Sequence, residues 1–373
     1  MLLSDICEII MGQSPSSDSY NVKGQGLPFF QGNADFGKLY PSVRLWCNCP
    51  IKKAEAGDLL VSVRAPIGAV NLANQKCCIG RGLAALRPYR DKCDAMYLYY
   101  LIKEGKNKLN WLGTGSTFKA ITRSSLLSFN VPDYCIAFQR KISGKLWSVD
   151  KLIHQRNEQL KLFDLLIQSR FLEMFGMSEG IDKHLEDVAD ICSGITKGRK
   201  VLGLELREVP YMAVSNVKMG YIDLSTVKTI MATENEIEQY RLFPNDILMT
   251  EGGDPDKVGR GAIIRNPPKD CIHQNHIFRV RLHKDVLLPE FFEEYLQGNS
   301  ARRYFLKAAK QTTGIASINM KQLRALPVKI PPIKVQIQYS DFVHQVDKSK
   351  MAVQKSLDEL ETLKKSLMQT YFG

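Results

Sequence analysis

The sequence predicts an α+β fold, in which two similar mixed α/β domains are separated by two long helices that form an antiparallel coiled coil with pseudo-two-fold symmetry. The first observation is an internal repeat: residues 139–176 align with residues 336–373, so that Gln336 lies 197 positions after Gln139, and both copies end in Phe-Gly. The second observation is an apolar stripe at helical spacing within both copies, and the third is a set of short β-rich runs outside them. A repeat on this scale indicates a duplicated architecture.

The repeat extends into the globular segments with an offset that grows along the chain. Leu3-Ser4-Asp5-Ile6 matches Leu185-Glu186-Asp187-Val188 at 182 positions, and Gly57-Asp58-Leu59-Leu60 matches Asn245-Asp246-Ile247-Leu248 at 188. The growing offset predicts insertions in the second copy, which we expect in loops. The predicted segments are a first globular domain at 1–135, a central helix at 136–179, a second globular domain at 180–333 and a C-terminal helix at 334–373.

Each globular segment is predicted to mix strands with short helices. Runs 59–63 and 277–281 are β-rich and are bounded by Gly, Pro or Asn, which is typical of strands. Runs 97–102 and 291–296 are predicted to form short helices.

The two long segments carry apolar residues at alternating spacings of four and three, which is the pattern of a coiled-coil seam. Because the second globular segment follows directly after the first helix, the helices can run antiparallel with one domain at each end. Arg156, Lys350 and Lys364 interrupt the seam, and each aligns with an apolar residue in the other copy. This asymmetry favours pairing of one helix with the other, although long stems that reach the surface would explain it as well. The seam and partner interface are predicted to contain Ile142, Leu146, Val149, Ile153, Leu160, Phe163, Val343, Val346, Val353, Leu357, Leu360 and Leu367.

Composition favours a polyanionic partner. Lys and Arg number 51 against 39 Asp and Glu, which gives a net charge of +12, and nucleic acid is favoured over membrane as the partner. The nine cysteines form no C-x-x-C pair, which is typical of reduced thiols in the cytoplasm. Asp5 and Glu8 interrupt the apolar start, so we expect no signal peptide, and no apolar run approaches the ~20 residues that a membrane helix needs.

The chain offers no motif for catalysis or metal binding. Asn266-Pro267-Pro268-Lys269 is similar to the N-P-P-aromatic tetrad of amino-methyltransferases, but Lys269 replaces the aromatic residue, and the segment is predicted to be a hairpin loop. A phosphate-binding P-loop is absent, and the six histidines lack metal-site spacing. We therefore expect a non-catalytic protein that binds no cofactor or metal.

Several loops have compositions suited to DNA. Small hydroxylic and basic residues can hold phosphates, and Arg, Gln and Asn can pair with base edges, although each could also be an ordinary turn residue. Their occurrence at comparable points of two diverged copies strengthens the prediction. The predicted DNA-binding residues are Gln13, Ser14, Arg64, Arg81, Thr114, Ser116, Lys119, Thr196, Lys197, Arg199, Arg260, Gln274, Asn275, Thr312 and Thr313.

Along its whole length, the chain resembles the specificity subunit of type I restriction–modification enzymes. The resemblance rests on motifs that occur in the same order twice. They are Leu3-Ser4-Asp5-Ile6 with Gly12, Gly57-Asp58-Leu59-Leu60, Gly113 with Gly115-Ser116-Thr117, and Val131-Pro132 with Gln139, followed by 185–188 with Gly194, 246–248, 312–319 and 330–332 with Gln336. Family members often carry Glu before the glutamine at the helix start, where this chain has Phe138 and Val335.

The resemblance implies two target-recognition domains, each of which reads one half of a bipartite, asymmetric site in double-stranded DNA. The helices would set the unspecified spacer and dock methyltransferase subunits, which use S-adenosylmethionine to methylate adenine. A motor-nuclease subunit would complete the complex. The alternative is a basic coiled-coil adaptor that joins two proteins without reading DNA, and the seam fits that hypothesis equally well.

Overall fold

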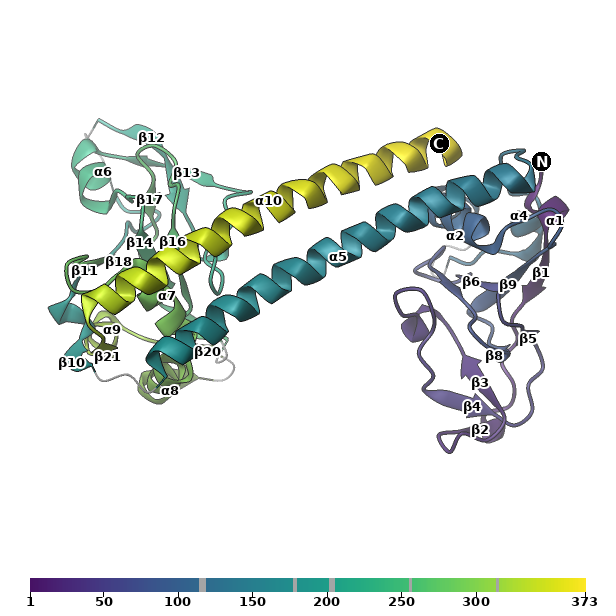
Figure 1. The fold of residues 1–373 in the computed structure, drawn as a ribbon, viewed down its shortest axis with the longest axis horizontal. Helices are drawn as coiled ribbons and strands as arrows, with labels where there is room; N and C mark the ends of the chain where they lie inside the picture. Colours follow the sequence, from purple (N-terminus) through teal and green to yellow (C-terminus); the bar gives the residue numbers. More distant parts are fainter. Residues whose placement is uncertain (114–118, 177–179, 201–204, 255–256, 313–314) are drawn as a thin grey trace. The chain divides into compact units, whose positions relative to one another are not determined.

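The computed structural model describes residues 1–113, 119–176, 180–200, 205–254, 257–312 and 315–373 (Figure 1). They form two units, each packed around cores of its own. Unit 1 comprises Met1–Glu158 and Gln354–Gly373, and unit 2 comprises Gln159–Val353. The helices α5 (Ile136–Phe175) and α10 (Ile333–Phe372) therefore each contribute one part to each unit.

Unit 1 contains two sheets and several short helices. The antiparallel four-stranded sheet has the order β1 (Cys7–Met11), β9 (Leu83–Pro88), β6 (Leu59–Ser62), β7 (Val70–Leu72). The five-stranded sheet has the order β2 (Tyr20–Asn21), β4 (Leu45–Cys47), β3 (Leu27–Phe30), β8 (Cys77–Ile79), β5 (Lys53–Ala54), with β3 and β8 parallel. The helices are α1 (Leu3–Ile6), η1 (Ser17–Ser19), η2 (Asn33–Asp35), α2 (Ala95–Glu104), α3 (Lys106–Leu112) and α4 (Arg123–Leu127).

Unit 2 repeats this arrangement. Its four-stranded sheet has the order β11 (Ala189–Ser193), β18 (Ile277–Leu282), β14 (Asp246–Thr250), β16 (Gly261–Ile264). Its second sheet has the order β13 (Lys228–Ala232), β12 (Arg207–Met212), β17 (Ile272–His273), with β12 and β17 parallel. The smaller sheets are β15 (Gly252–Gly253), β20 (Ile315–Ser317), β19 (Lys310–Thr312), and β10 (Ile181–His184) with β21 (Pro327–Ile330). The helices are η3 (Leu185–Asp187), η4 (Val214–Asn216), α6 (Glu234–Tyr240), α7 (Pro289–Gln297), α8 (Asn299–Ala308) and α9 (Met320–Arg324).

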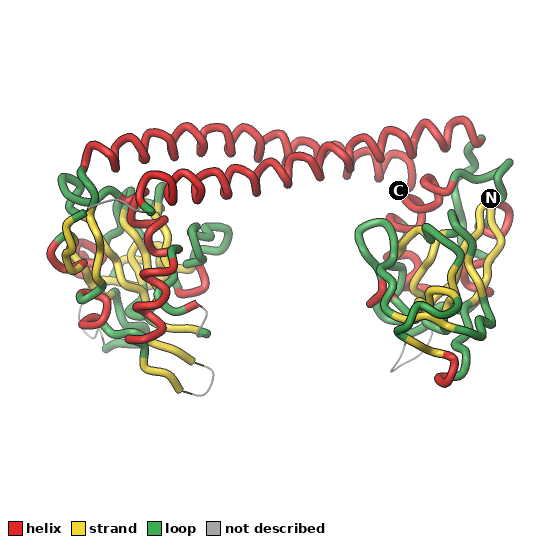
Figure 2. The backbone as a smooth tube through the Cα atoms, turned by 60° about the horizontal axis from the view of Figure 1, so that its bottom comes forward, coloured by secondary structure: helices red, strands yellow, loops and turns green. Residues whose placement is uncertain are grey.

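The strands and short helices predicted from the sequence are confirmed, and the physical reason is burial. The strand β6, at the predicted run 59–63, is buried along its whole length, and so is β14, its counterpart in unit 2. Asp94 is the N-cap that precedes α2, and its side chain accepts a hydrogen bond from the Tyr97 backbone N–H. Figure 2 shows the strands gathered in the globular part of each unit.

A buried glutamine joins each globular part to its long helix in the same way. The Gln139 side chain accepts from the Asp94 N–H at 3.0 Å and donates to the Lys92 and Tyr134 carbonyls at 2.9 and 2.8 Å. Gln336 makes the same three bonds in unit 2, accepting from the Leu288 N–H and donating to the Val286 and Pro331 carbonyls. The glutamine at the helix start is therefore a structural anchor in both units.

The two long helices pack antiparallel within each unit. In unit 1 Lys364 of α10 is 2.5 Å from Asp150 of α5, and in unit 2 Lys350 of α10 is 2.6 Å from Asp164 of α5. The two lysines thus bind aspartates of the other helix, which supports the predicted pairing of unlike helices. Arg156 is half-buried in α5.

The residues predicted for the seam lie on the less exposed stripe of both helices, and their burial is uneven. Ile142 and Leu146 also belong to the hydrophobic core of unit 1. Ile142, Leu146, Val149, Val343, Val346, Val353 and Leu357 are buried, whereas Ile153, Leu160, Phe163, Leu360 and Leu367 are half-buried. No helix in the described part of the chain has the length and apolar character needed to cross a membrane.

Candidate nucleic-acid interface

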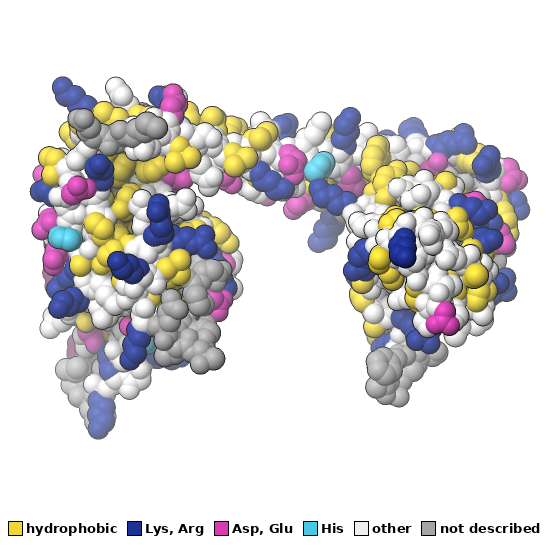
Figure 3. All heavy atoms as spheres, turned by 90° about the horizontal axis from the view of Figure 1, so that it is seen from below, with side chains coloured by type: hydrophobic (Ala, Val, Ile, Leu, Met, Phe, Trp, Pro, Cys, Tyr) yellow, Lys and Arg dark blue, Asp and Glu magenta, His cyan; other side chains and the backbone are white. Residues whose placement is uncertain are grey.

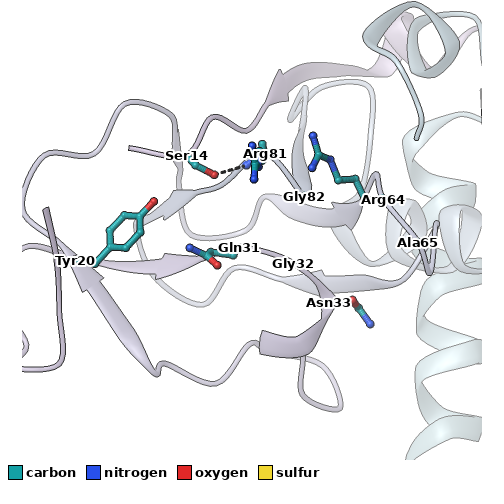
Figure 4. Close-up of a pocket in the computed structure, with 9 residues that line it drawn as sticks. All are labelled: Ser14, Tyr20, Gln31, Gly32, Asn33, Arg64, Ala65, Arg81 and Gly82. Atoms are coloured by element: carbon teal, nitrogen blue, oxygen red, sulfur yellow. Dashed lines mark hydrogen bonds between the residues drawn. The ribbon is translucent and has the colours of Figure 1, made fainter. Parts of the chain in front are cut away.

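A pocket of about 300 Å³ lies at one edge of unit 1, where loops from both sheets meet (Figure 4). Arg81 and Arg64 lie on one side of this pocket, and Gln31 and Asn33 lie on the other. The lining residues are Ser14, Tyr20, Gln31, Gly32, Asn33, Arg64, Ala65, Arg81 and Gly82. Three of them, Ser14, Arg64 and Arg81, were predicted from the sequence as DNA-binding residues, and the fold brings them together.

Backbone hydrogen bonds hold these loops in place. The Gln13 N–H donates to the Ile79 carbonyl at 3.0 Å, and the Gly80 N–H donates to the Phe30 carbonyl at 2.8 Å. The Arg81 N–H donates to Ser14 Oγ at 3.2 Å, so the Ser14 side chain is used for positioning within the pocket.

Glycine is required where the loops approach most closely. A Cβ atom at Gly82 would lie 2.3 Å from the Gln31 carbonyl oxygen, and one at Gly12 would lie 2.1 Å from the Gly80 carbonyl oxygen. Larger residues at these two positions would push the loops apart and open the pocket.

The pocket is positively charged and free of carboxylates. Arg64 and Arg81 are exposed, and their guanidinium groups make no hydrogen bond or ion pair with any residue in the described ranges. Elsewhere in unit 1, Arg44 pairs with Asp35 and Arg87 pairs with Asp58. Three other pockets lined by described residues each include at least one carboxylate. An anion or a hydrogen-bond acceptor therefore suits the pocket of unit 1 best.

The remaining predicted residues of unit 1 lie around this pocket or outside the described residues. Gln13 is exposed beside Ser14, and Lys119 is exposed next to Ala120, which forms an antiparallel β-bridge with Arg64. Thr114 and Ser116 lie outside the described residues.

Unit 2 repeats the loop framework with different side chains. The Ile195 N–H donates to the His273 carbonyl at 2.8 Å, and the Gln274 N–H donates to the Met212 carbonyl at 3.0 Å, as the matching bonds do in unit 1. The place of Arg81 is taken by Asn275, and that of Ser14 by Thr196.

The place of Arg64 is taken by a glycine. Gly252 pairs with Ser317 in the register in which Arg64 pairs with Ala120. Arg260 corresponds to Ala69 of unit 1 and not to Arg64. The Arg260 carbonyl accepts a hydrogen bond from the Thr250 N–H, and the Ala69 carbonyl accepts the matching bond from the Ser62 N–H.

Arg199 differs from the other predicted residues because its donors are engaged within unit 2. Its guanidinium binds both carboxylate oxygens of Glu236 at 2.5 Å and also donates to the Met231 carbonyl at 3.0 Å. The hydrogen bonds from Arg199 lower the pKa of Glu236 to about 2. Arg199 therefore holds a loop to α6 in this structure, and its role as a DNA contact stays a prediction.

The other predicted residues of unit 2 are spread over several loops. Thr196 and Lys197 are exposed, Arg260 and Asn275 are half-buried, and Gln274 Oε1 accepts from the Val214 N–H at 3.4 Å. Thr312 ends β19, and Thr313 lies outside the described residues.

Sequence reasoning missed Gln31 and Asn33. A signal was present, since both follow the Pro28-Phe29-Phe30 strand that aligns with the second copy, but only the parallel pairing of β3 with β8 places them beside Arg81.

Among the described residues, His, Cys, Asp and Glu form no group of three or more that could hold a metal ion. Figure 3 shows Lys and Arg side chains spread over the drawn face of each unit.

A duplicated α/β scaffold with conserved internal bonds and different side chains at its loop ends defines a two-domain recognition protein. The chain belongs to the family described as type I restriction modification DNA specificity domain, whose model matches residues 1–162 and again residues 179–362.

The chain is 44% identical over 152 residues to a putative type I restriction enzyme MjaX specificity subunit of Methanocaldococcus jannaschii; this match covers 41% of the chain and 36% of that relative. It is 24% identical over 327 residues to the type I restriction enzyme EcoKI specificity subunit of Escherichia coli, covering 80% of the chain and 68% of that relative. The crystal structure of a type I restriction–modification system S subunit from M. genitalium matches with a TM-score of 0.60 at 15% identity, covering 100% of the chain and 95% of that structure, and shows the same fold.

Proposed function

We propose that this chain is the sequence-specific DNA-binding subunit of a type I restriction–modification enzyme. Each globular part reads one half of a bipartite, asymmetric site in double-stranded DNA, and the paired helices set the spacer between the two halves. The chain itself is non-catalytic and works in the cytoplasm, where its DNA is accessible.

The observation that carries this proposal is one loop framework used twice with different side chains. Two backbone bonds recur: those from the Gln13 N–H to the Ile79 carbonyl and from the Gly80 N–H to the Phe30 carbonyl in unit 1 correspond to those from the Ile195 N–H to the His273 carbonyl and from the Gln274 N–H to the Met212 carbonyl in unit 2. The neighbouring side chains differ, with Ser14 and Arg81 in unit 1 and Thr196 and Asn275 in unit 2. A scaffold that keeps its backbone and changes its loop side chains suits two different half-sites. The net charge of +12 favours a DNA backbone as the common partner.

The partners we propose are methyltransferase subunits and a motor-nuclease subunit. The helix α5 exposes large apolar side chains, among them Trp147, Leu162 and Leu172, which offer surface for docking subunits. S-adenosylmethionine would be bound by the methyltransferase subunits, and this chain would bind no cofactor.

The decisive experiment is adenine methylation across the genome by single-molecule sequencing in the source organism, with the gene intact, deleted and restored. The proposal expects one bipartite, asymmetric motif to lose methylation on deletion and regain it on restoration. As an independent test in vitro, selection from random duplexes with the assembled complex should enrich the same split motif. Failure to enrich any motif with the partner subunits present would favour the adaptor alternative.

A further inference from the structure

We infer that the pocket of unit 1 reads guanine in one half of the DNA site through Arg64 and Arg81, and that unit 2 reads its half without arginine at the matching place. This inference rests on the proposed function and adds the residues and the base chemistry of one half-site.

The charge balance of the pocket points to a ligand that accepts hydrogen bonds. The pocket has two guanidinium groups, no carboxylate, and the amide side chains of Gln31 and Asn33 opposite them (Figure 4). No described residue satisfies the polar groups of these four side chains. Their donors and acceptors are thus available for a ligand.

Guanine fits this donor arrangement better than the other bases do. In the major groove guanine presents N7 and O6, two acceptors on one edge, and an arginine fork binds both at once. Gln31 and Asn33 can bind a neighbouring adenine through N6 and N7. The pocket therefore combines donors for guanine with amides for an adjacent base pair.

The two arginines are carried by firmly held backbone, which is what discrimination between bases requires. Arg64 follows the buried strand β6 and forms the bridge with Ala120. Arg81 follows β8, and its N–H is held by Ser14 Oγ at 3.2 Å. Both side chains thus leave the sheet edge at defined points.

The matching place in unit 2 lacks the two arginine side chains. Gly252 and Asn275 replace the two arginines, and the short helix η4 begins at Val214 where η2 begins at Asn33. Next to this place His276 Nδ1 is 2.6 Å from Glu251 Oε2, which brings a carboxylate to the site. A carboxylate repels phosphates and accepts hydrogen bonds from cytosine N4, so unit 2 is suited to a different base pattern.

The test uses the complete complex with Arg64→Lys, Arg64→Ala, Arg81→Lys and Arg81→Ala. Lysine keeps the charge but lacks the planar fork, so it should preserve binding while relaxing base identity. The control is Arg123→Ala, which removes the same charge from an exposed position of unit 1 outside the pocket. Two readouts are made: the methylated motif in cells, and the affinity for the wild-type site against duplexes with each G·C pair replaced by A·T.

We expect each pocket variant to relax one G·C position, all in the same half-site, with a loss of discrimination of about 10- to 100-fold at that position. The control should leave the motif unchanged. The inference is overturned if the affinity falls equally for all duplexes and the slope of log affinity against log salt concentration falls by the contribution of about one phosphate contact. The arginines would then bind the DNA backbone. It is also overturned if no position relaxes, or if the relaxed position is A·T.

The two proposals fail in different ways. If the wild-type gene controls no bipartite motif, the proposed function fails. If the motif exists and the arginine variants leave its base identities intact, only the assignment of guanine reading to this pocket fails. The lysine variants keep the test valid even if an alanine variant does not fold.

Discussion

Replacing Gln139 with alanine should destabilise unit 1 far more than a substitution at an exposed helix position. Gln139 is 1% exposed and satisfies one backbone N–H and two carbonyls, at distances of 2.8 to 3.0 Å. A buried polar group left without its partner costs about 1–3 kcal/mol. With three groups affected and some access for water, we expect a loss of about 4 kcal/mol in the free energy of unfolding.

The three tryptophans allow this loss to be measured in unit 1 alone. Trp46, Trp111 and Trp147 all lie in unit 1, so urea unfolding followed by tryptophan fluorescence reports on that unit. With a urea slope of about 2 kcal/mol per molar, the midpoint should fall by about 2 M. Gln155→Ala, at an exposed position of α5, serves as the control and should move the midpoint very little.

The twin anchor Gln336 provides the matched comparison. Gln336→Ala should lower the urea midpoint of a transition seen by far-UV circular dichroism, because the bonds of Gln336 lie in unit 2. The midpoint seen by tryptophan fluorescence should stay nearly unchanged. A fall of less than about 0.5 M for Gln139→Ala would refute the anchoring argument. An equal fall of the fluorescence midpoint in both variants would show that the two units unfold together.

Three further predictions concern the helices, the loops and a buried acid. Deleting one heptad from each helix, within 142–167 and 339–364, shortens each by about 10.5 Å, and the methylated motif should keep its half-sites and lose about three base pairs of spacer at 3.4 Å each; changed half-sites with an unchanged spacer would contradict the idea of a molecular ruler. Lys119→Ala should weaken reading of the half-site that Arg64 serves and spare the other half, which affinity for duplexes altered in one half would measure; equal weakening of both would argue against modular reading. Burial raises the pKa of Glu293 to about 7 from the ordinary 4.5, so the folded state holds its proton more tightly than the unfolded state does, and stability falls as pH rises from about 4.5 to about 7. Between pH 4.5 and pH 8, the free energy of unfolding should fall by about 3 kcal/mol less for Glu293→Gln than for the wild type, as measured by urea unfolding followed by circular dichroism. Parallel pH profiles of the two proteins would disprove the raised pKa of Glu293.

Much of the framework could be predicted because local patterns specify it. The apolar spacing that begins after Gln139 and Gln336 specifies two long helices, and the structure gives each 40 residues. The seam was predicted by periodicity, but periodicity does not report how much surface a partner covers. Ile153 is therefore half-buried, whereas Ile142, packed in the core of unit 1, is buried.

The candidate site was harder to predict because its members come from distant points of the chain. Ser14, Arg64 and Arg81 were identified by residue type, but nothing in their spacing says that they share one pocket. Arg199 has the same side chain and a comparable loop, yet Glu236 of a later helix takes up its donors. Residue type indicates what a side chain can bind, and only its neighbours decide whether it is available.

The sequence by itself determined the duplication, the two long helices and the basic character, because these depend on repeats, periodicity and charge, which are properties of the order of residues. The tertiary structure decided which loops meet, since the parallel pairing of β3 with β8 brings Gln31 beside Arg81. It also decided which arginines remain free for a ligand. Those outcomes depend on strand pairing and side-chain contacts between segments tens of residues apart, where the free energy of packing, rather than local preference, selects the arrangement.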